Sequence, residues 1–192
     1  HKGTLIENKT SGAFLAEYLH RHLTHIAQDP NYAETEAAVL LAGLNRAFGE
    51  KLKNDHPQIL EEGIKYGPAA ALCLIKLHDD GTYSYAIASD CALVEIGTHN
   101  EAFVAPEQEK PYHIEQNRLD LAQKLMREEG LTLEDALKHP DYKAAYKTFR
   151  ELVNTEWPVF NGDQALEGLL LHGRRPLDDV AALVLMTDGM FL

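Results

Sequence analysis

Hydrophobic residues recur at helical spacing in two stretches near the start of the chain. The first stripe runs from Phe14 to Ile26, and Thr10 or Ser11 can cap the helix that it predicts. Asp29-Pro30-Asn31 interrupts the pattern, and a second stripe runs from Ala37 to Leu52. Two consecutive amphipathic helices, each with one apolar face, need a common surface to cover.

The pattern then changes to short apolar runs. Residues 69–75 and 83–88 are such runs, and His78-Asp79-Asp80-Gly81 joins them, as in a β-hairpin. A third run at 92–97 extends the sheet. The N-terminal half therefore predicts two helices followed by at least three antiparallel strands.

Helical spacing returns in the second half of the chain. Residues 98–115 are polar and predict a loop, and the segment of about 116–154 predicts a helical insertion. A short helix is expected at 164–171, and an apolar strand at 180–186.

Composition and charge narrow the classes of function. The chain has 192 residues, of which 45% are hydrophobic. It contains 18 Lys and Arg and 30 Asp and Glu, which gives a net charge of −12. No run of Lys or Arg appears, so we expect neither a nucleic-acid partner nor a membrane partner. Only two cysteines occur, which favours a reducing compartment, and we expect a cytoplasmic protein. The chain begins without Met and stops within an apolar stretch, so we expect one domain, 1–192, that is incomplete at both ends.

Two of the predicted strands end in an aspartate at a turn. Asp90 follows the run that ends at Ala88, and Asp188 follows Thr187 and precedes Gly189. A carboxylate fixed at the end of a buried strand is a common ligand for a hard cation. Aspartate is also an ordinary turn residue, so each position alone has two interpretations.

In their order along the chain, these motifs resemble the metal-dependent serine/threonine protein phosphatases of type 2C, in a bacterial form. Gly67-Pro68-Ala69-Ala70-Ala71 stands where the family has Gly, then Ser or Thr residues and Ala. Ser89-Asp90-Cys91-Ala92 stands where it has Gly-Asp-Ser-Arg, and Thr187-Asp188-Gly189 matches its Asp-Gly turn directly. The resemblance covers roughly residues 10–97 and 157–192.

The sequence also departs from the family pattern. The family has an Asp-Gly turn ahead of the first helix, whereas no aspartate precedes Asp29 here. It also has a late Asp-Asn turn, after the Thr-Asp-Gly strand, which this sequence does not reach. Either the missing ligands lie outside this sequence, or the protein is a degenerate relative.

The resemblance implies a fold, a cofactor and a reaction. The implied fold is α/β (α+β), a four-layer αββα sandwich of mainly antiparallel sheets flanked by helix pairs. Two or three Mn²⁺ or Mg²⁺ ions would activate a water that attacks phosphoserine or phosphothreonine of a phosphoprotein substrate. By resemblance Asp188 is a catalytic residue and a metal ligand of the core pair, and Asp90 is a ligand of a further metal ion. The alternative is a catalytically degenerate regulatory or binding module.

Three other groups of polar residues are interpreted as structural or solvated residues and not as parts of a functional site. Asp178-Asp179 begins the strand that Asp188 ends, so this pair lies at the opposite end and predicts a solvated turn. His22 and His25 share a helix face, but no Cys or Glu is placed to complete a zinc site with them. Arg174-Arg175 is expected in a solvated loop, because it lies just before Pro176.

Overall fold

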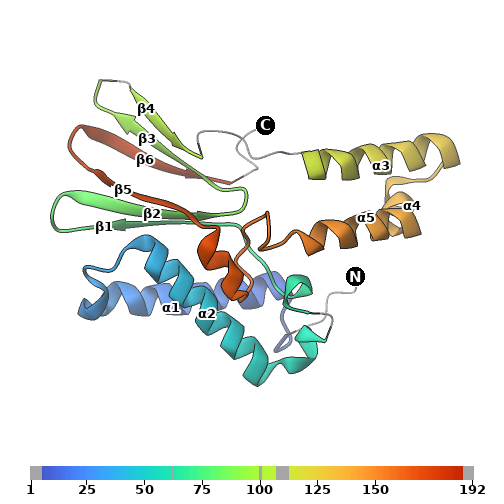
Figure 1. Ribbon diagram of the computed structural model, residues 1–192, viewed down its shortest axis with the longest axis horizontal. Helices are drawn as coiled ribbons and strands as arrows, with labels where there is room; N and C mark the ends of the chain where they lie inside the picture. The colour runs from blue at the N-terminus through green and yellow to red at the C-terminus, as the bar shows by residue number, and fades with distance from the viewer. Residues whose placement is uncertain (1–5, 62, 100, 107–112, 188–192) are drawn as a thin grey trace. The chain divides into compact units, whose positions relative to one another are not determined.

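The computed structural model of the protein describes residues 6–61, 63–99, 101–106 and 113–187. The chain divides into two compact units, one of residues 1–107 and 154–192 and the other of residues 108–153. The described helices are α1 (Ser11–Gln28), α2 (Ala37–Asp55), α3 (His113–Glu129), α4 (Leu133–Lys138) and α5 (Pro140–Glu151) (Figure 1). The described strands are β1 (Leu72–Leu77), β2 (Thr82–Ala88), β3 (Ala92–Gly97), β4 (Ala102–Ala105), β5 (Leu171–Pro176) and β6 (Val180–Met186). None of these helices is long and apolar enough to cross a membrane.

The described strands form two antiparallel sheets, with the orders β1-β2-β5 and β4-β3-β6. The hairpin predicted from the sequence is present: Leu77 pairs with Tyr83 next to its turn, where Gly81 has a φ of +77°. The strands β5 and β6 follow one another in the chain but belong to different sheets. The mixed α+β class with antiparallel sheets is therefore confirmed.

The larger unit is layered around β2, which is buried on both faces. Ala86 and Ala88 pack in one core with residues of α1 and α2, such as Phe14 and Phe48. Alternate residues of β2, which point to the opposite face, pack in a second core with residues of the other sheet; they are Tyr83, Tyr85 and Ile87. The first sheet thus lies between the helix pair and the second sheet (Figure 1). The fourth layer stays a prediction.

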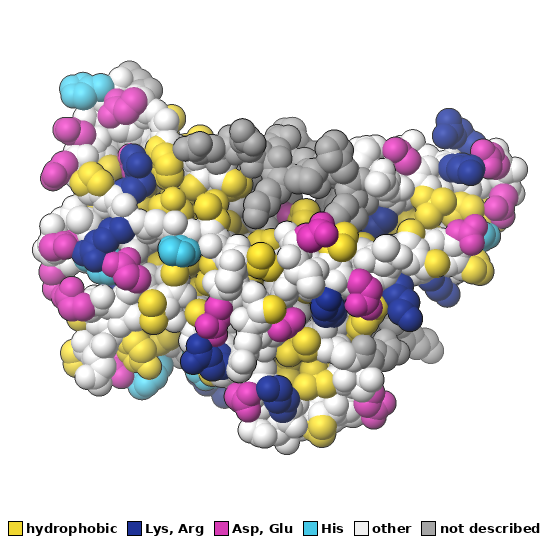
Figure 2. All heavy atoms as spheres, in the orientation of Figure 1, with side chains coloured by type: hydrophobic (Ala, Val, Ile, Leu, Met, Phe, Trp, Pro, Cys, Tyr) yellow, Lys and Arg dark blue, Asp and Glu magenta, His cyan; other side chains and the backbone are white. Residues whose placement is uncertain are grey.

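The outer face of the second sheet carries apolar side chains. Val94 and Ile96 of β3 lie on it, with Val104 of β4 opposite Val94. Ile96 is 38% exposed and Val104 is 40% exposed. Hydrophobic side chains reach the surface over this sheet in Figure 2.

The helices predicted before residue 154 agree with the structure. Thr10 caps α1, since its hydroxyl accepts the N–H of Ala13, and Asp29 ends this helix. In the smaller unit, Gly130, with a φ of +67°, ends α3, and the Thr132 hydroxyl accepts the N–H of Asp135 at the start of α4. The helices α3, α4 and α5 pack on one another.

Two strands occur where the sequence predicted loops. The four-residue β4 lies in the expected loop 98–115 and forms a hairpin with β3. The expected helix 164–171 is a 3₁₀ helix at Gln164–Gly168, and β5 begins at Leu171. The prediction that Arg174-Arg175 lies in a loop is wrong. Both residues are in β5, which is polar in sequence and is specified by its pairing with β2.

Candidate functional site

The turn that holds Asp90 connects the two sheets. It follows β2 and precedes β3, and Asp90 is half-buried there. Ser89 has a φ of 65°, in the left-handed region that residues other than glycine seldom adopt. Its hydroxyl accepts a hydrogen bond of 2.9 Å from Nε1 of Trp157 and lies 3.4 Å from Oδ1 of Asp90. A distant indole thus supports the turn that presents the Asp90 carboxylate.

The segment that carries Trp157 is itself fixed by a buried asparagine. Asn154 is 3% exposed, and its amide donates to the carbonyl of Val159 and to Oδ1 of Asn161. Its backbone N–H bonds the carbonyl of Trp157, which closes a tight turn. Because this network is buried, it holds Trp157 in place against Ser89.

Strand pairing brings the end of β6 to the same end of the structure as Asp90. Met186, the last residue of β6, pairs with Ala92, which lies two residues after Asp90. Asp188, the predicted catalytic residue and metal ligand, lies outside the described residues. Asp178 and Asp179 are exposed in a turn at the opposite end of β6, where the carbonyl of Asp179 accepts the N–H of Thr98. They are therefore separated from Asp90, as predicted.

The donor set for a metal is incomplete within the described residues. No group of three or more His, Cys, Asp or Glu side chains in the described part of the chain is placed to hold an ion. Asp90 alone offers a half-buried carboxylate at the predicted place, and such an oxygen ligand suits Mn²⁺ or Mg²⁺.

The surroundings of His22, His25 and Cys73 indicate packing or exposed positions. Nδ1 of His22 lies 2.8 Å from the carbonyl oxygen of Tyr18, and the two rings stack at 4.0 Å. His25 is exposed. Burial, with a smaller contribution from the Cys91 thiol, raises the pKa of Cys73 to about 12. The Cys73 thiol is therefore protonated at neutral pH, which does not suit a nucleophile.

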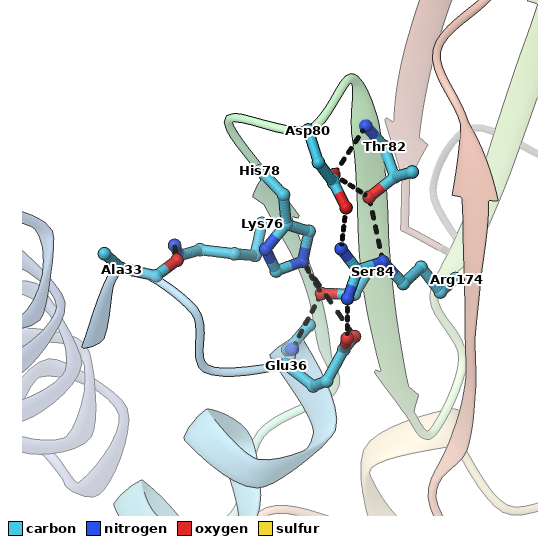
Figure 3. Close-up of polar contacts among 9 residues, drawn as sticks. Ala33, Glu36, Lys76, His78, Asp80, Thr82, Ser84 and Arg174 are labelled. Atoms are coloured by element: carbon cyan, nitrogen blue, oxygen red, sulfur yellow. Dashed lines mark hydrogen bonds and ion pairs between the residues drawn. The ribbon is translucent and has the colours of Figure 1, made fainter. Parts of the chain in front are cut away.

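The structure also contains a polar cluster that the sequence did not predict (Figure 3). It is centred on Arg174, which donates to three acceptors: Oε1 of Glu36 at 2.5 Å, Oδ2 of Asp80 at 2.6 Å and the hydroxyl of Thr82 at 2.8 Å. The Thr82 hydroxyl, which donates to Asp80, is the first cause of a lowered pKa of that carboxyl, and Arg174 adds to it. These contacts join β5, the β1–β2 turn and the residue before α2. Since they connect residues up to 138 positions apart, no local sequence signal indicates them.

A serine and a histidine in this cluster resemble a nucleophile and its base. Nε2 of His78 lies 2.8 Å from Oγ of Ser84 and 3.9 Å from Oε2 of Glu36. Yet Ser84 is only 1% exposed, and its hydroxyl accepts the N–H of Ala37. Ser84 therefore caps helix α2 from a neighbouring strand, and no substrate can reach its oxygen.

Between the sheets, a second ionic group surrounds Glu95. Arg175 donates to both carboxylate oxygens of Glu95, at 2.8 and 3.1 Å, and Tyr83 donates to one of them at 2.5 Å. The Arg175 guanidinium, 3.9 Å from the ring centre of Phe103, holds the pKa of the Glu95 carboxyl below its usual value. Arg175 is thus bound within the structure, contrary to the prediction of a solvated residue.

No protein-family model matches the chain, and no curated protein or solved structure matches it. The family resemblance therefore rests on the quoted motifs and on their order along the chain.

Proposed function

We propose that the protein is a Mn²⁺- or Mg²⁺-dependent phosphatase that hydrolyses phosphoserine and phosphothreonine on proteins, and that it acts in the cytoplasm. The observation that carries the proposal is the pairing of Ala92 with Met186. This pairing brings the turn of Asp90 and the end of β6 to one end of the second sheet. In our proposal, both motifs quoted for the metal ions converge there.

Two carboxylates would meet at this end of the sheet. In our proposal the side chains of Asp90 and Asp188 lie near each other there. Like charges held near each other repel. A divalent cation bound there would relieve this repulsion.

Each residue has a stated role in this proposal. Asp188 would hold the ions that activate the attacking water, and Asp90 would hold an additional ion. When bound, the ions would lower the pKa of the water and neutralise charge on the phosphate. Trp157 and Ser89 would keep the Asp90 turn in shape.

The test is a metal titration of phosphatase activity with an aryl phosphate and a phosphopeptide. We expect activity only with Mn²⁺ or Mg²⁺, and none in excess chelator. Asp188→Asn should lower turnover at least about 100-fold, which is the scale for a residue that holds a catalytic ion. Asp90→Asn should lower activity at limiting metal and recover in part at high Mn²⁺. In the absence of metal, neither variant should melt earlier than the parent, because each removes a repelling charge.

The matched control is Asp178→Asn, which changes an exposed aspartate beyond the other end of β6 and should leave the titration unchanged. Full activity in chelator would contradict the metal-dependent mechanism. Wild-type turnover of Asp188→Asn at saturating Mn²⁺ would show that Asp188 is only a turn residue. The regulatory or binding module would then be the better hypothesis.

A further inference from the structure

The loop that precedes the 3₁₀ helix Gln164–Gly168 contains the dipeptide Asn161-Gly162. Of the eight asparagines in the chain, Asn161 is the one that a glycine follows. Because glycine has no Cβ, its backbone nitrogen can approach the side-chain amide of the preceding asparagine without steric hindrance. The sequence therefore favours deamidation at Asn161 over the other asparagines.

Deamidation at an Asn-Gly pair needs neither an enzyme nor an oxidant. The backbone nitrogen of the glycine attacks Cγ of the asparagine. An N–Cγ bond forms, the Cγ–Nδ2 bond breaks, and the amide leaves as ammonia with the proton of the attacking N–H. Water then opens the resulting succinimide at one of its two carbonyl groups. The product is an aspartate or an isoaspartate, and either carries a negative charge that asparagine lacks.

The folded structure engages both reacting groups in hydrogen bonds. Oδ1 of Asn45, on α2, accepts the N–H groups of Asn161 and Gly162 at 3.1 and 2.8 Å. Oδ1 of Asn161 accepts the side-chain amide of Asn154 at 2.8 Å and the N–H of Asp163 at 2.9 Å. Asn45 and Asn161 are fully buried. The attacking nitrogen and the amide that it must reach are therefore both held in place.

The reaction thus requires the loop to open. Residues 152–163, all of which the structure describes, lie in no helix and in none of the strands of the two sheets. Irregular segments of this kind open at a lower free energy than the core of a sheet or helix. The contact with α2 opposes the opening, since a Cβ on Gly49 would lie only 2.2 Å from the carbonyl oxygen of Gly162.

We propose that Asn161 is a site of spontaneous deamidation, which the contacts of this loop with Asn45 and Gly49 suppress and which local opening of the loop releases. The product does not fit the native contacts. Nδ2 of Asn161 lies 3.4 Å from the carbonyl oxygen of Ile64, to which it donates, and a carboxylate oxygen there would face that carbonyl without a proton. An isoaspartate also lengthens the backbone where Gly162 lies against Gly49.

The modification affects the turn that holds Asp90. The Asn154 amide donates to Asn161, and the backbone N–H of Asn154 bonds the carbonyl of Trp157. The Trp157 indole in turn donates to Ser89. A charge at position 161 therefore weakens the support of the Asp90 turn, and the change is irreversible. This effect does not depend on the proposed phosphatase activity.

The test follows all asparagines of the whole chain by peptide mapping with mass spectrometry, during incubation in a mildly alkaline buffer. In urea, where the chain is unfolded, Asn161 should deamidate fastest. In the folded parent it should deamidate at least about tenfold more slowly than in urea. Equal rates at Asn161 in the two conditions, or a faster asparagine elsewhere in urea, would overturn the proposal.

Three variants separate local opening from unfolding of the whole chain. Gly49→Ala must displace Gly162, so it should raise the rate in the folded chain at least about fivefold. Gly43→Ala, where an added Cβ meets no described atom within 4 Å, should not raise it. Glu95→Gln weakens the contact between the sheets instead, and it should raise the rate less than Gly49→Ala does. Equal acceleration by Glu95→Gln and Gly49→Ala would overturn the role of the loop contacts. If Gly49→Ala does not fold, the comparison of folded and unfolded parent still decides.

The variant Asn161→Asp places the aspartyl product in the chain directly. Trp157 is the single tryptophan of the chain, so intrinsic fluorescence reports on its turn. We expect emission at a longer wavelength, from a more exposed indole, and a lower melting temperature than in the parent. Asn117→Asp adds the same charge at an exposed position and should change neither quantity. Parent-like emission and melting of Asn161→Asp would overturn the effect on the Trp157 turn.

Discussion

At the scale of single residues, the turn at Ser89 combines backbone strain with a hydrogen bond from a distant side chain. A left-handed conformation at a residue with a side chain costs about 1–2 kcal/mol. Ser89 adopts it with a φ of 65°, and the Trp157 indole donates to its hydroxyl. A glycine adopts the same conformation without this strain. The bond from Trp157 therefore offsets strain that a glycine would not create.

This arrangement predicts coupling between the two residues. Trp157→Phe removes the N–H donor and should lower the free energy of unfolding by about 1 kcal/mol. In a Ser89→Gly background the same change should have a smaller effect, because the hydroxyl that accepts the bond is gone. Urea unfolding of the four proteins in a double-mutant cycle measures the difference. Strictly additive effects would show that the bond does not stabilise the turn.

The sequence predicts the turn at Asp90 but not the residues that support this turn. Its position after an apolar run, at a turn, is a local pattern. The bond between Ser89 and Trp157 joins residues 68 positions apart, and the cap of α2 by Ser84 joins residues 47 positions apart. Contacts of this kind depend on the tertiary structure, and a single sequence contains no periodic signal for them.

At the scale of elements, helix α2 fits closely against the loop that precedes the 3₁₀ helix Gln164–Gly168. A Cβ on Gly49 of α2 would lie 2.2 Å from the carbonyl oxygen of Gly162. Asn45, one turn earlier and fully buried, accepts the N–H groups of Asn161 and Gly162 through its side-chain oxygen. The contact therefore requires a glycine in the middle of a helix.

Two glycines of α2 provide a matched test. Gly43 has no atom within 4 Å of an added Cβ, so Gly43→Ala should gain helix propensity and raise the free energy of unfolding by about 0.5–1 kcal/mol. Gly49→Ala gains the same propensity but must displace the backbone of Gly162, so it should lower the free energy of unfolding by about 1–3 kcal/mol. The midpoints of denaturant unfolding give both values. Equal shifts in the same direction would contradict the close approach.

Elements with a strong hydrophobic periodicity could be predicted from the sequence. Elements whose conformation depends on pairing with a distant segment could not. The helix pair and the hairpin combine an apolar pattern with a cap or an Asp-Gly turn, so local chemistry and tertiary structure agree. The strand β5 reads Leu-His-Gly-Arg-Arg-Pro, and its arginines bind carboxylates of other segments. Its conformation follows from pairing with β2, which no window of the sequence contains.

At the scale of the whole molecule, the two sheets are joined by ionic contacts as well as by apolar packing. Glu95 of the second sheet binds Arg175 and Tyr83 of the first. The Glu95 side chain is only 12% exposed, so losing one partner would leave a charge poorly solvated. An ionic bond at this position also disfavours a slip of one sheet past the other, because only one register pairs the charges.

The bond at Glu95 makes stability depend on pH in a stated direction. Arg175 lowers the pKa of the Glu95 carboxyl in the folded protein, so the folded state binds a proton there less readily than the unfolded state. This contribution is fully present above the usual pKa of Glu, and it is lost as pH falls through the folded value. Acidification from about pH 7 to about pH 3 should therefore lower the free energy of unfolding of the parent chain, and part of this loss comes from the bond at Glu95.

Replacing the carboxyl isolates that part of the pH dependence. Glu95→Gln should lower the free energy of unfolding by about 2 kcal/mol at pH 7, because a charged hydrogen-bond acceptor is lost while Arg175 stays in place. Its stability should then fall less than that of the parent on acidification. Glu167→Gln is the control, since its pair with Arg46 is more exposed and exposed pairs contribute at most about 1 kcal/mol. Urea unfolding at several pH values measures all three proteins. If Glu95→Gln loses as much stability in acid as the parent, the bond between the sheets contributes nothing to the acid response.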